Sequence, residues 1–185
     1  MSLRAELVAA ARETLRLGLV TGTSGNLSAR DGDLIEITPS GFAYEMMTEE
    51  DLVTLAPDGR VIAGEREPSS EHRVHLAVYA ARPDASAIVH THSVHATAWS
   101  FLEEMLDTET EELEHTAGGG VRTAPFAPTG SDEIAARCVA ALEGRRAALL
   151  ARHGVVALGA TPAEALVICQ AVERQAQIAW LLRLG

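Results

Sequence analysis

The stretch Ser86-Ala87-Ile88-Val89-His90-Thr91-His92 decides how the rest of the chain is interpreted. Its short apolar run predicts a buried strand, and two histidines stand at the end of that strand. Successive side chains on a strand point to opposite faces, so His90 and His92 share a face while Thr91 points away. Two imidazoles on one face of a strand end can ligate a single metal ion, which makes this pair a candidate metal site.

A third histidine, His153, offers another ligand. Residues 147–152 are mainly apolar and have the length of a strand, and they end at His153-Gly154, where a turn presents side chains at the end of a strand. Three protein ligands leave one coordination position open for a substrate, as in catalytic zinc sites. The remaining histidines have no comparable spacing and are interpreted as structural; they are His72, His75, His95 and His115.

Helical and strand patterns alternate along the rest of the chain. Apolar residues at helical spacing predict helices at 3–17, 94–101, 132–142 and 162–185. A further helix is predicted to begin at a cap formed by Ser69 or Ser70 and to run to about residue 82. Strands are predicted at 34–38, 52–55, 61–62, 121–127, 147–152 and 155–158, with hairpin turns at Asp31-Gly32-Asp33 and Pro57-Asp58-Gly59. Because hairpins outnumber βαβ crossovers, we predict one α/β domain over residues 1–185 with a mixed, mainly antiparallel sheet.

The composition excludes several classes of protein. The formal net charge of −11 argues against a nucleic-acid partner. No apolar run approaches the roughly 20 residues of a membrane span. The first residues, Met1 to Glu6, carry an acid and no apolar segment, so no signal peptide is predicted and a cytoplasmic location is expected. Cys138 and Cys169 are interpreted as buried, reduced side chains, and the acidic run 103–114 as a solvated loop or helix face.

Three loops rich in small polar residues suggest an anion site. They are Ser24-Gly25-Asn26, Pro39-Ser40-Gly41 and Pro68-Ser69-Ser70-Glu71. Glycine lets the backbone approach an anion, and serine hydroxyls donate to its oxygens, so a phosphate can be captured despite the negative net charge. Each loop alone is also compatible with an ordinary turn or helix cap. Their combination with the histidines favours a functional site.

Five segments together resemble the class II aldolase/adducin family, in order and from about Gly18 to Gly159. They are Thr23-Ser24-Gly25-Asn26, Ile37-Thr38-Pro39-Ser40-Gly41, Pro68-Ser69-Ser70-Glu71, His90-Thr91-His92-Ser93-Val94-His95 and Arg152-His153-Gly154. The similarity is greatest to the ketose-1-phosphate aldolases of the family. It implies a three-layer α/β/α fold around the predicted sheet.

The resemblance also implies the roles of individual residues. His90, His92 and His153 would hold one Zn²⁺, or another divalent metal, in each chain, with Glu71 as a ligand in the resting site and as the base during turnover. The substrate phosphate would be bound by Gly25, Asn26, Ser40, Gly41, Ser69 and Ser70. The implied protein is a homotetramer with sites between subunits and with no nucleic-acid or membrane partner.

The implied activity is that of a zinc-dependent lyase. It would reversibly cleave a phosphorylated ketose to dihydroxyacetone phosphate and an aldehyde through an enediolate, whose charge a divalent ion stabilises. Related epimerases carry Asp after the paired serines, so Glu71 favours aldol cleavage. A decarboxylase or dehydratase on the same scaffold, with Glu112 or Glu114 as acid/base, is an alternative. A non-catalytic, adducin-like scaffold is another, which the intact set of three histidines disfavours.

The proton donor to the aldehyde oxygen is left open. Aldolases of this family use a tyrosine from a neighbouring subunit, located shortly before a segment that corresponds to Ala117-Gly118-Gly119. The preceding residues 111–116 contain no tyrosine here. The two tyrosines of the chain, Tyr44 and Tyr79, fall in segments interpreted as structural.

Overall fold

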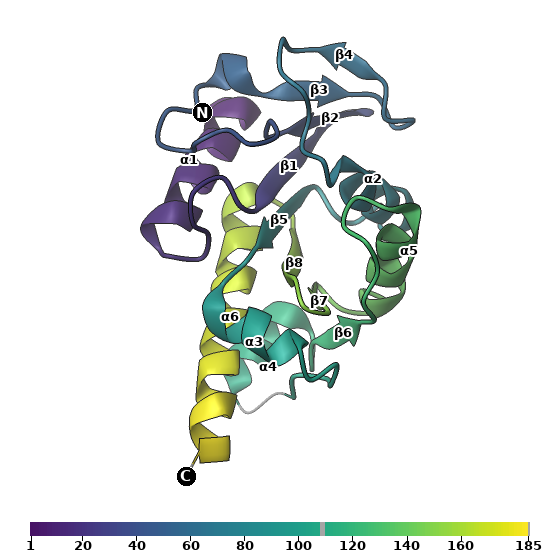
Figure 1. Ribbon diagram of the computed structural model, residues 1–185. Helices are drawn as coiled ribbons and strands as arrows, with labels where there is room; N and C mark the ends of the chain where they lie inside the picture. The colour runs from purple at the N-terminus through teal and green to yellow at the C-terminus, as the bar shows by residue number, and fades with distance from the viewer. Residues whose placement is uncertain (108–109, 185) are drawn as a thin grey trace.

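The computed structural model describes residues 1–107 and 110–184, and its strands form one sheet (Figure 1). The sheet has eight strands in the order β4-β3-β2-β1-β5-β8-β7-β6. Their bounds are β1 Asn26–Asp31, β2 Leu34–Ile37, β3 Val53–Leu55, β4 Val61–Ala63, β5 Ala87–Thr91, β6 Arg122–Ala124, β7 Ala147–Leu150 and β8 Gly154–Gly159. Neighbouring strands are antiparallel except β6 and β7, which are parallel. The predicted mixed, mainly antiparallel sheet is confirmed.

Short turns produce the antiparallel pairs. Gly32 and Asp33 join β1 to β2, and Gly32 has a φ of 61°, a left-handed conformation that glycine adopts readily. The predicted hairpin around Pro57-Asp58-Gly59 joins β3 to β4. A three-residue turn, 151–153, joins β7 to β8. β5 lies between β1 and β8 in the interior of the sheet, and all its residues are buried. The C-terminal end of β5 is therefore flanked by strands on both sides.

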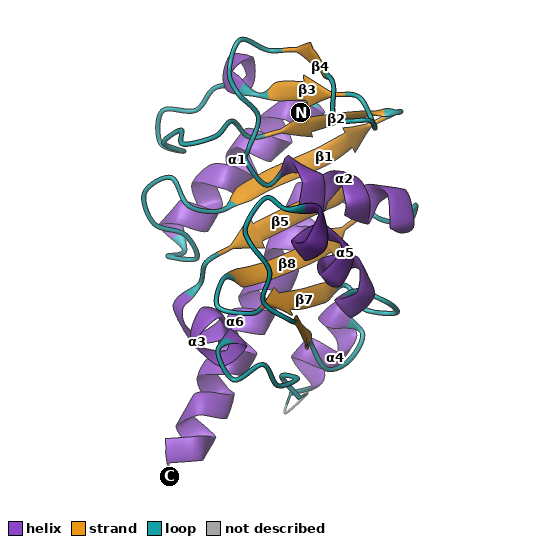
Figure 2. Ribbon diagram, turned by 45° about the vertical axis from the view of Figure 1, so that its right-hand side comes forward, coloured by secondary structure: helices purple, strands orange, loops and turns teal. Residues whose placement is uncertain are grey.

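Helices cover both faces of the sheet and give the three layers that were expected (Figure 2). One face packs against α1 Leu3–Arg16, α3 Val94–Ser100, α4 Glu111–Ala117 and α6 Pro162–Leu184. The other face packs against α2 His72–Ala81 and α5 Asp132–Ala141. Each interface buries its own apolar cluster, so the central sheet is enclosed between two cores. A short 3-10 helix, Glu49–Asp51, precedes β3.

The helix α6 supports the centre of the sheet. Its buried Leu166, Cys169, Val172 and Ala176 recur at helical spacing, and the helix packs on β5 and β8. Cys169 and Cys138 are both buried and free, as expected. No helix in the described part of the chain is long and apolar enough to cross a membrane.

One detail differs from the sequence interpretation. α2 begins at His72 with Glu71 as its N-cap residue, so neither serine caps it. Instead, Oγ of Ser69 accepts a hydrogen bond from the Glu71 N–H at 3.2 Å, which shapes the turn before the helix. Within the acidic run, interpreted as a solvated loop or helix face, residues 111–114 open α4 with their three glutamates exposed, and Leu113 is fully buried. Residues 108–109 of that run lie outside the described part.

Candidate metal centre

Neighbouring strand ends bring the three predicted histidines together. His90 lies on β5, His92 follows that strand directly, and His153 lies in the turn between β7 and β8. Because Thr91 pairs with Val155 across β5 and β8, this turn is held beside the end of β5. The three imidazole rings pack edge to face, with each pair of ring centres 4.8 Å apart. The convergence expected from the sequence is present in the structure.

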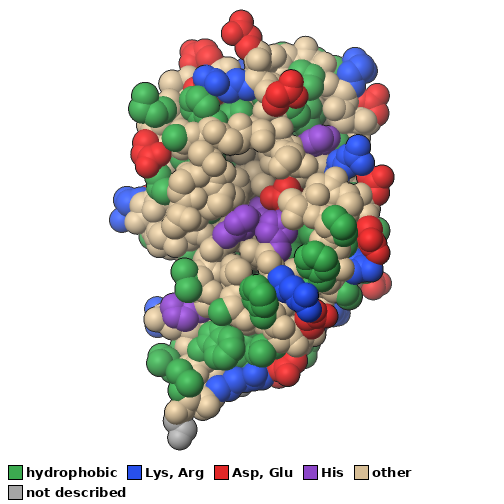
Figure 3. All heavy atoms as spheres, in the orientation of Figure 1, with side chains coloured by type: hydrophobic (Ala, Val, Ile, Leu, Met, Phe, Trp, Pro, Cys, Tyr) green, Lys and Arg blue, Asp and Glu red, His purple; other side chains and the backbone are tan. Residues whose placement is uncertain are grey.

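Glu71 joins this cluster from the N-terminus of α2. Its Oε2 lies 3.3 Å from Nε2 of His90, and its Oε1 lies 3.3 Å from Nε2 of His153. One potential ligand atom from each of Glu71, His90, His92 and His153 lies within 4.8 Å of the others. Figure 3 shows histidine side chains gathered in a hollow at the middle of this face, with a carboxylate beside them. We call these four residues the metal cluster.

The orientation of His90 is fixed by the neighbouring strand. Its Nδ1 lies 2.8 Å from the backbone oxygen of Val155. A carbonyl oxygen only accepts hydrogen bonds, so Nδ1 carries a hydrogen and donates it. The other ring nitrogen, Nε2, therefore faces the metal cluster. A partner on the far nitrogen is the usual way in which proteins orient a metal-binding histidine.

The carboxyl group of Glu71 is ionised although it is only 6% exposed. Burial raises its pKa, but the charge and hydrogen bond of His90, the charge of His153 and a hydrogen bond from Asn26 together lower the pKa well below its usual value. The Asn26 bond runs from Nδ2 to Oε2 at 2.8 Å. The cluster thus contains a permanent negative charge at neutral pH.

Burial and the charge of Glu71 both shift the pKa values of the three histidines. Burial lowers the pKa of His92 to about 3 and that of His153 to about 4, and the neighbouring His90 lowers both further. Burial also lowers the pKa of His90, but the charge of Glu71 and the Val155 carbonyl outweigh it and raise that pKa. The cluster therefore attracts a positive charge at Nε2 of His90, which a metal ion can supply in place of a proton.

The donor set fits a divalent cation. Three imidazole nitrogens and one carboxylate are ligands that zinc commonly takes. Oε1 of Glu71 is buried and has no hydrogen-bond partner among the described residues. A buried carboxylate oxygen without a partner is unfavourable unless a cation lies near it. The metal cluster can therefore hold a divalent metal at these four side chains.

Two glycines allow the close packing behind the cluster. Gly25 has a φ of 77°, and a Cβ there would lie 2.7 Å from the backbone oxygen of His90. A Cβ on Gly154 would collide with the backbone oxygen of Thr91 and lie 3.0 Å from Cδ2 of His92. Larger side chains at either position would push the strand end that carries the histidines out of place.

The three small-residue loops meet above the metal cluster. The Ser40 N–H donates to the Glu67 oxygen at 2.9 Å, and the Ser69 N–H donates to the Thr38 oxygen at 3.1 Å, so two of the loops are tied together. They surround a cavity of about 480 Å³ that opens on the metal cluster. Its lining consists of Thr23, Ser24, Gly25, Asn26, Pro39, Ser40, Gly41, Ser69, Ser70, Glu71, His92, Thr129, Arg152 and His153.

The predicted phosphate residues all line this cavity, but they differ in exposure. Ser40, Gly41 and Ser70 are exposed, whereas Ser69 and Asn26 are each 4% exposed. The side chain of Asn26 is already hydrogen-bonded to Glu71 and to His75. Ser70 and Ser40 therefore offer the most accessible hydroxyl groups for a ligand, while Asn26 sits deeper, beside the carboxylate.

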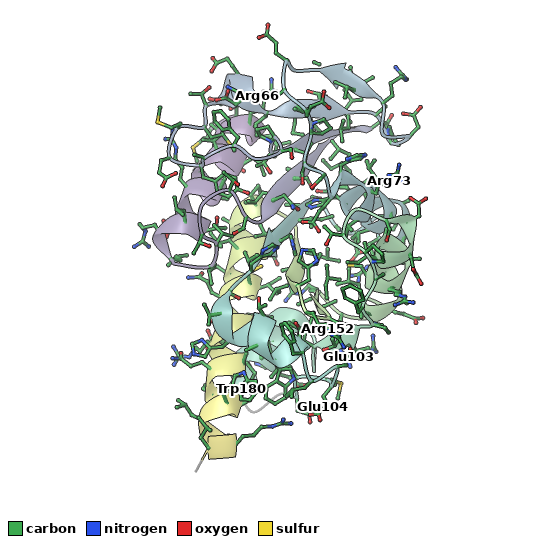
Figure 4. All side chains as sticks on the ribbon, in the orientation of Figure 1. Arg66, Arg73, Glu103, Glu104, Arg152 and Trp180 are labelled. Carbon is green, nitrogen blue, oxygen red and sulfur yellow. The ribbon has the colours of Figure 1, made fainter. Side chains whose placement is uncertain are left out.

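Five residues that line the cavity were not predicted as site residues, and three of these, Thr23, Ser24 and Pro39, lie in or directly beside the small-residue loops. Thr129 lies in the loop before α5, where nothing local distinguishes it. Arg152 precedes His153 and has a φ of 62°, which is uncommon for a residue with a side chain. Its Nη2 lies 3.2 Å from Oε1 of Glu103, and Figure 4 shows the two side chains next to each other. The position of Arg152 directly before the third ligand was the one available signal.

The two tyrosines, the acid/base candidates Glu112 and Glu114, and His115 lie elsewhere. Tyr44 and Tyr79 are 1% and 4% exposed, and neither lines the cavity. Glu112 lines a different cavity, beside α6, and lies 3.5 Å from Arg174. Glu114 and His115 are exposed on α4. Within the described part of one chain, none of these groups reaches the metal cluster.

Comparisons with known proteins agree with this geometry. A profile described as "Class II Aldolase and Adducin N-terminal domain" matches residues 5–180. The L-fuculose phosphate aldolase of Escherichia coli K12 is 40% identical over 166 residues, which cover 90% of this chain and 77% of that protein. A 5-methylthioribulose-1-phosphate/5-deoxyribulose-1-phosphate aldolase of Rhodospirillum rubrum is 38% identical, covering 97% of this chain and 81% of that protein. A solved L-fuculose 1-phosphate aldolase superposes with a TM-score of 0.94 at 38% identity, covering 98% of this chain and 86% of the other.

Proposed function

The chain belongs to the class II aldolase and adducin family, and we propose that it is a metal-dependent aldolase acting on a phosphorylated ketose. In this reaction a carbon–carbon bond of the ketose is cleaved reversibly to give dihydroxyacetone phosphate and an aldehyde. The observation that carries the proposal is the convergence of Glu71 with His90, His92 and His153 at the base of a cavity lined by serine and glycine loops.

We assign the metal to the three histidines and Glu71, and we propose that it is zinc, one ion per chain. The nitrogen-rich donor set favours zinc over magnesium or calcium, which prefer oxygen ligands. When bound, the ion would supply the positive charge that stabilises the enediolate oxygens left by cleavage. The hydrogen bond from His90 to Val155 keeps the ligand nitrogen aimed at this position.

Glu71 is the proposed base. Its carboxylate is ionised, and its Oε1 has no hydrogen-bond partner among the described residues, so this oxygen is free to take a proton. The proton would come from the carbon next to the carbonyl of dihydroxyacetone phosphate in the condensation direction, and it would return to that carbon in the cleavage direction. Oε2 stays hydrogen-bonded to Asn26, which holds the carboxylate in place.

The loops above the metal cluster would hold the phosphate. Backbone N–H groups and hydroxyl groups around the cavity can donate to a dianion, and the nearby N-terminus of α2 adds a favourable dipole. Fixing this remote end orients the reacting carbons beside Glu71. The proposed phosphate residues are Gly25, Asn26, Ser40, Gly41, Ser69 and Ser70.

We also propose that residues 1–185 form one domain, that the protein is cytoplasmic, and that it assembles into a homotetramer with sites between subunits. Within the described part of the chain, none of Tyr44, Tyr79, Glu112, Glu114 and His115 lines the cavity, which supports a contribution from a neighbouring subunit. Light scattering on the purified protein measures the assembly state. A fully active monomer would contradict the assembly proposal and leave the aldolase proposal intact.

The activity is tested with a panel of ketose 1-phosphates and zinc-loaded protein. Release of dihydroxyacetone phosphate, coupled to its reduction by a dehydrogenase, is the expected result. Metal removal by a chelator should abolish the release, and zinc should restore it. Epimerisation, loss of CO₂ or loss of water across the whole panel, without carbon–carbon cleavage, would identify one of the alternative activities on this scaffold and overturn the aldolase proposal.

A further inference from the structure

A chain of buried hydrogen bonds runs from Glu71 into the protein. Oε2 of Glu71 bonds to Nδ2 of Asn26 at 2.8 Å, and Oδ1 of Asn26 lies 2.5 Å from Nε2 of His75. Nδ1 of His75 lies 2.6 Å from Oγ of Ser28, which lies 2.9 Å from the hydroxyl of Tyr79. All five side chains are 6% exposed or less. We call this chain the Glu71 relay.

The direction of each bond in the Glu71 relay follows from the carboxylate. An ionised carboxylate only accepts, so Asn26 must present its Nδ2 to Glu71 and its Oδ1 to His75. Oδ1 also only accepts, so Nε2 of His75 must carry a hydrogen. In a neutral ring Nδ1 then has a lone pair, which accepts from Ser28, and Ser28 in turn accepts from Tyr79. In this one arrangement each hydrogen bond from Oε2 of Glu71 to the Tyr79 hydroxyl has one donor and one acceptor.

The charge state of His75 agrees with this arrangement. Burial lowers the pKa of His75 to about 3, and the neighbouring His90 adds to the effect. The ring is 1% exposed, and its two hydrogen-bond partners, Ser28 and Asn26, are both uncharged. A neutral imidazole therefore satisfies the Glu71 relay at physiological pH.

We propose that His75 is the positioning residue for Glu71. Without the Nε2–H of His75, the amide of Asn26 is free to rotate and to turn Oδ1 toward Oε2 of Glu71. Two oxygens that both carry partial or full negative charge repel each other, so the carboxylate would lose its fixed position. His75 acts through Asn26 and does not touch the substrate. This inference rests on the proposed role of Glu71 as base.

A positioning role predicts a particular pattern of kinetic losses. His75→Leu removes the donor at similar volume, and it should lower kcat about 10- to 100-fold, the usual effect of losing an outer-shell partner. KM should change less than kcat, because Ser40 and Ser70, the most accessible donors to the phosphate, are untouched. His75→Gln should recover most of kcat, because its amide can donate to Asn26 from nearly the place of Nε2.

The control variant is Tyr79→Phe. It shortens the Glu71 relay at its far end but leaves His75, Asn26 and Glu71 paired, so kcat should stay at the wild-type value. Metal content and thermal unfolding are measured for every variant to identify protein that is misfolded or lacks metal. Equal losses in His75→Leu and Tyr79→Phe, or failure of His75→Gln to recover activity, would show that the region only packs the fold and would overturn the proposal.

A spectroscopic measurement tests the wild-type protein directly. In ¹⁵N NMR of zinc-loaded protein labelled at histidine, the His75 ring should be the neutral Nε2–H form at pH 7, with the signal assigned by its loss in His75→Gln. A charged ring or an Nδ1–H form would overturn the proposal even if variants fail to fold. This readout needs no turnover, so it separates failure of the relay from failure of the aldolase assignment, which would appear as an inactive wild-type protein.

Discussion

The Nε2 atoms of His90 and His92 lie 2.9 Å apart at the centre of the metal cluster. The hydrogen of His90 is held at Nδ1 by the Val155 carbonyl. Two ring nitrogens with lone pairs directed at one another repel unless a cation or a proton lies between them. The pair is therefore arranged for a shared positive charge.

The first prediction follows from this pair. Wild-type protein should contain about one zinc per chain, and a His90→Ala, His92→Ala double variant should lose both the metal and the activity. His115→Ala is a matched control for metal content, because this histidine is exposed on α4 and does not belong to the metal cluster. Metal is quantified by mass spectrometry of the purified proteins. Full zinc occupancy in the double variant would rule out the assigned ligands.

A second prediction concerns the phosphate loops. Ser70 lines the cavity and is exposed. Its hydroxyl group makes no hydrogen bond to any residue in the described part of the chain. Ser70→Ala should therefore raise KM for a phosphorylated ketose more than for its unphosphorylated analogue. Loss of one donor to a dianion should cost about 1.5–3 kcal/mol. Equal changes for both substrates would mean that the loop is only a structural turn.

The third prediction concerns Glu173, which lies on α6 and anchors the segment after His92. Its carboxylate accepts from the N–H groups of His95 and Ala96 at 3.0 and 2.9 Å. Glu173→Ala leaves two N–H groups at the start of α3 without this partner, so it should lower the free energy of unfolding by about 1–3 kcal/mol and weaken zinc binding. Chemical denaturation and zinc competition measure the two effects. Arg174→Ala, an exposed neighbour, should change neither.

The convergence of His90, His92 and His153 could be predicted from the sequence because their signals are local. The spacing of His90 and His92 follows from the two-residue period of a strand, and His153 follows from the break of an apolar run into a turn. The hairpin turns were likewise predictable from short glycine-containing segments. These features depend only on residues close together in the chain.

The features that could not be predicted depend on contacts between segments that are distant in the sequence. Asn26 and His75 are 49 residues apart, and their bond is set by how α2 lies across β1. No period in the sequence encodes that placement, so His75 was interpreted as structural although it lies one helical turn after Glu71. The burial of Leu113 within an acidic segment likewise depends on distant contacts, since it follows from the packing of α4 against α6.

A fourth prediction uses the neutral state of His75. Its pKa is about 3 in the folded protein and near 6.5, the ordinary value for histidine, in the unfolded chain. Between these values the unfolded chain binds a proton that the folded protein does not, so stability falls as pH falls below 6.5. In metal-free protein the wild type should lose up to about 1.4 kcal/mol per pH unit more than His75→Gln. The free energy of unfolding of both proteins is measured between pH 6 and pH 4.5, in steps of ~0.5. Parallel curves for the wild type and His75→Gln would show that His75 is protonated in the folded protein and would contradict the prediction.

The last prediction concerns Glu71 itself. Glu71→Gln preserves the size of the side chain and removes its charge, so the three histidines should still bind zinc, although more weakly. The phosphate loops are unchanged, so substrate should still bind. Without a base, kcat should fall by about 10²- to 10⁴-fold, the usual contribution of a positioned acid/base.

Proton exchange isolates the step assigned to Glu71. Wild-type protein in deuterated water should exchange the proton next to the carbonyl of dihydroxyacetone phosphate without any aldehyde present, which removes the unknown proton donor from the measurement. Glu71→Gln should lose this exchange in parallel with kcat, while its zinc content shows that the ligands remain. If the variant exchanged the proton at the wild-type rate, the base would be another group, with Glu112, Glu114 and His115 the next residues to test. Because these three side chains lie outside the cavity of their own chain, they would have to act from a neighbouring subunit.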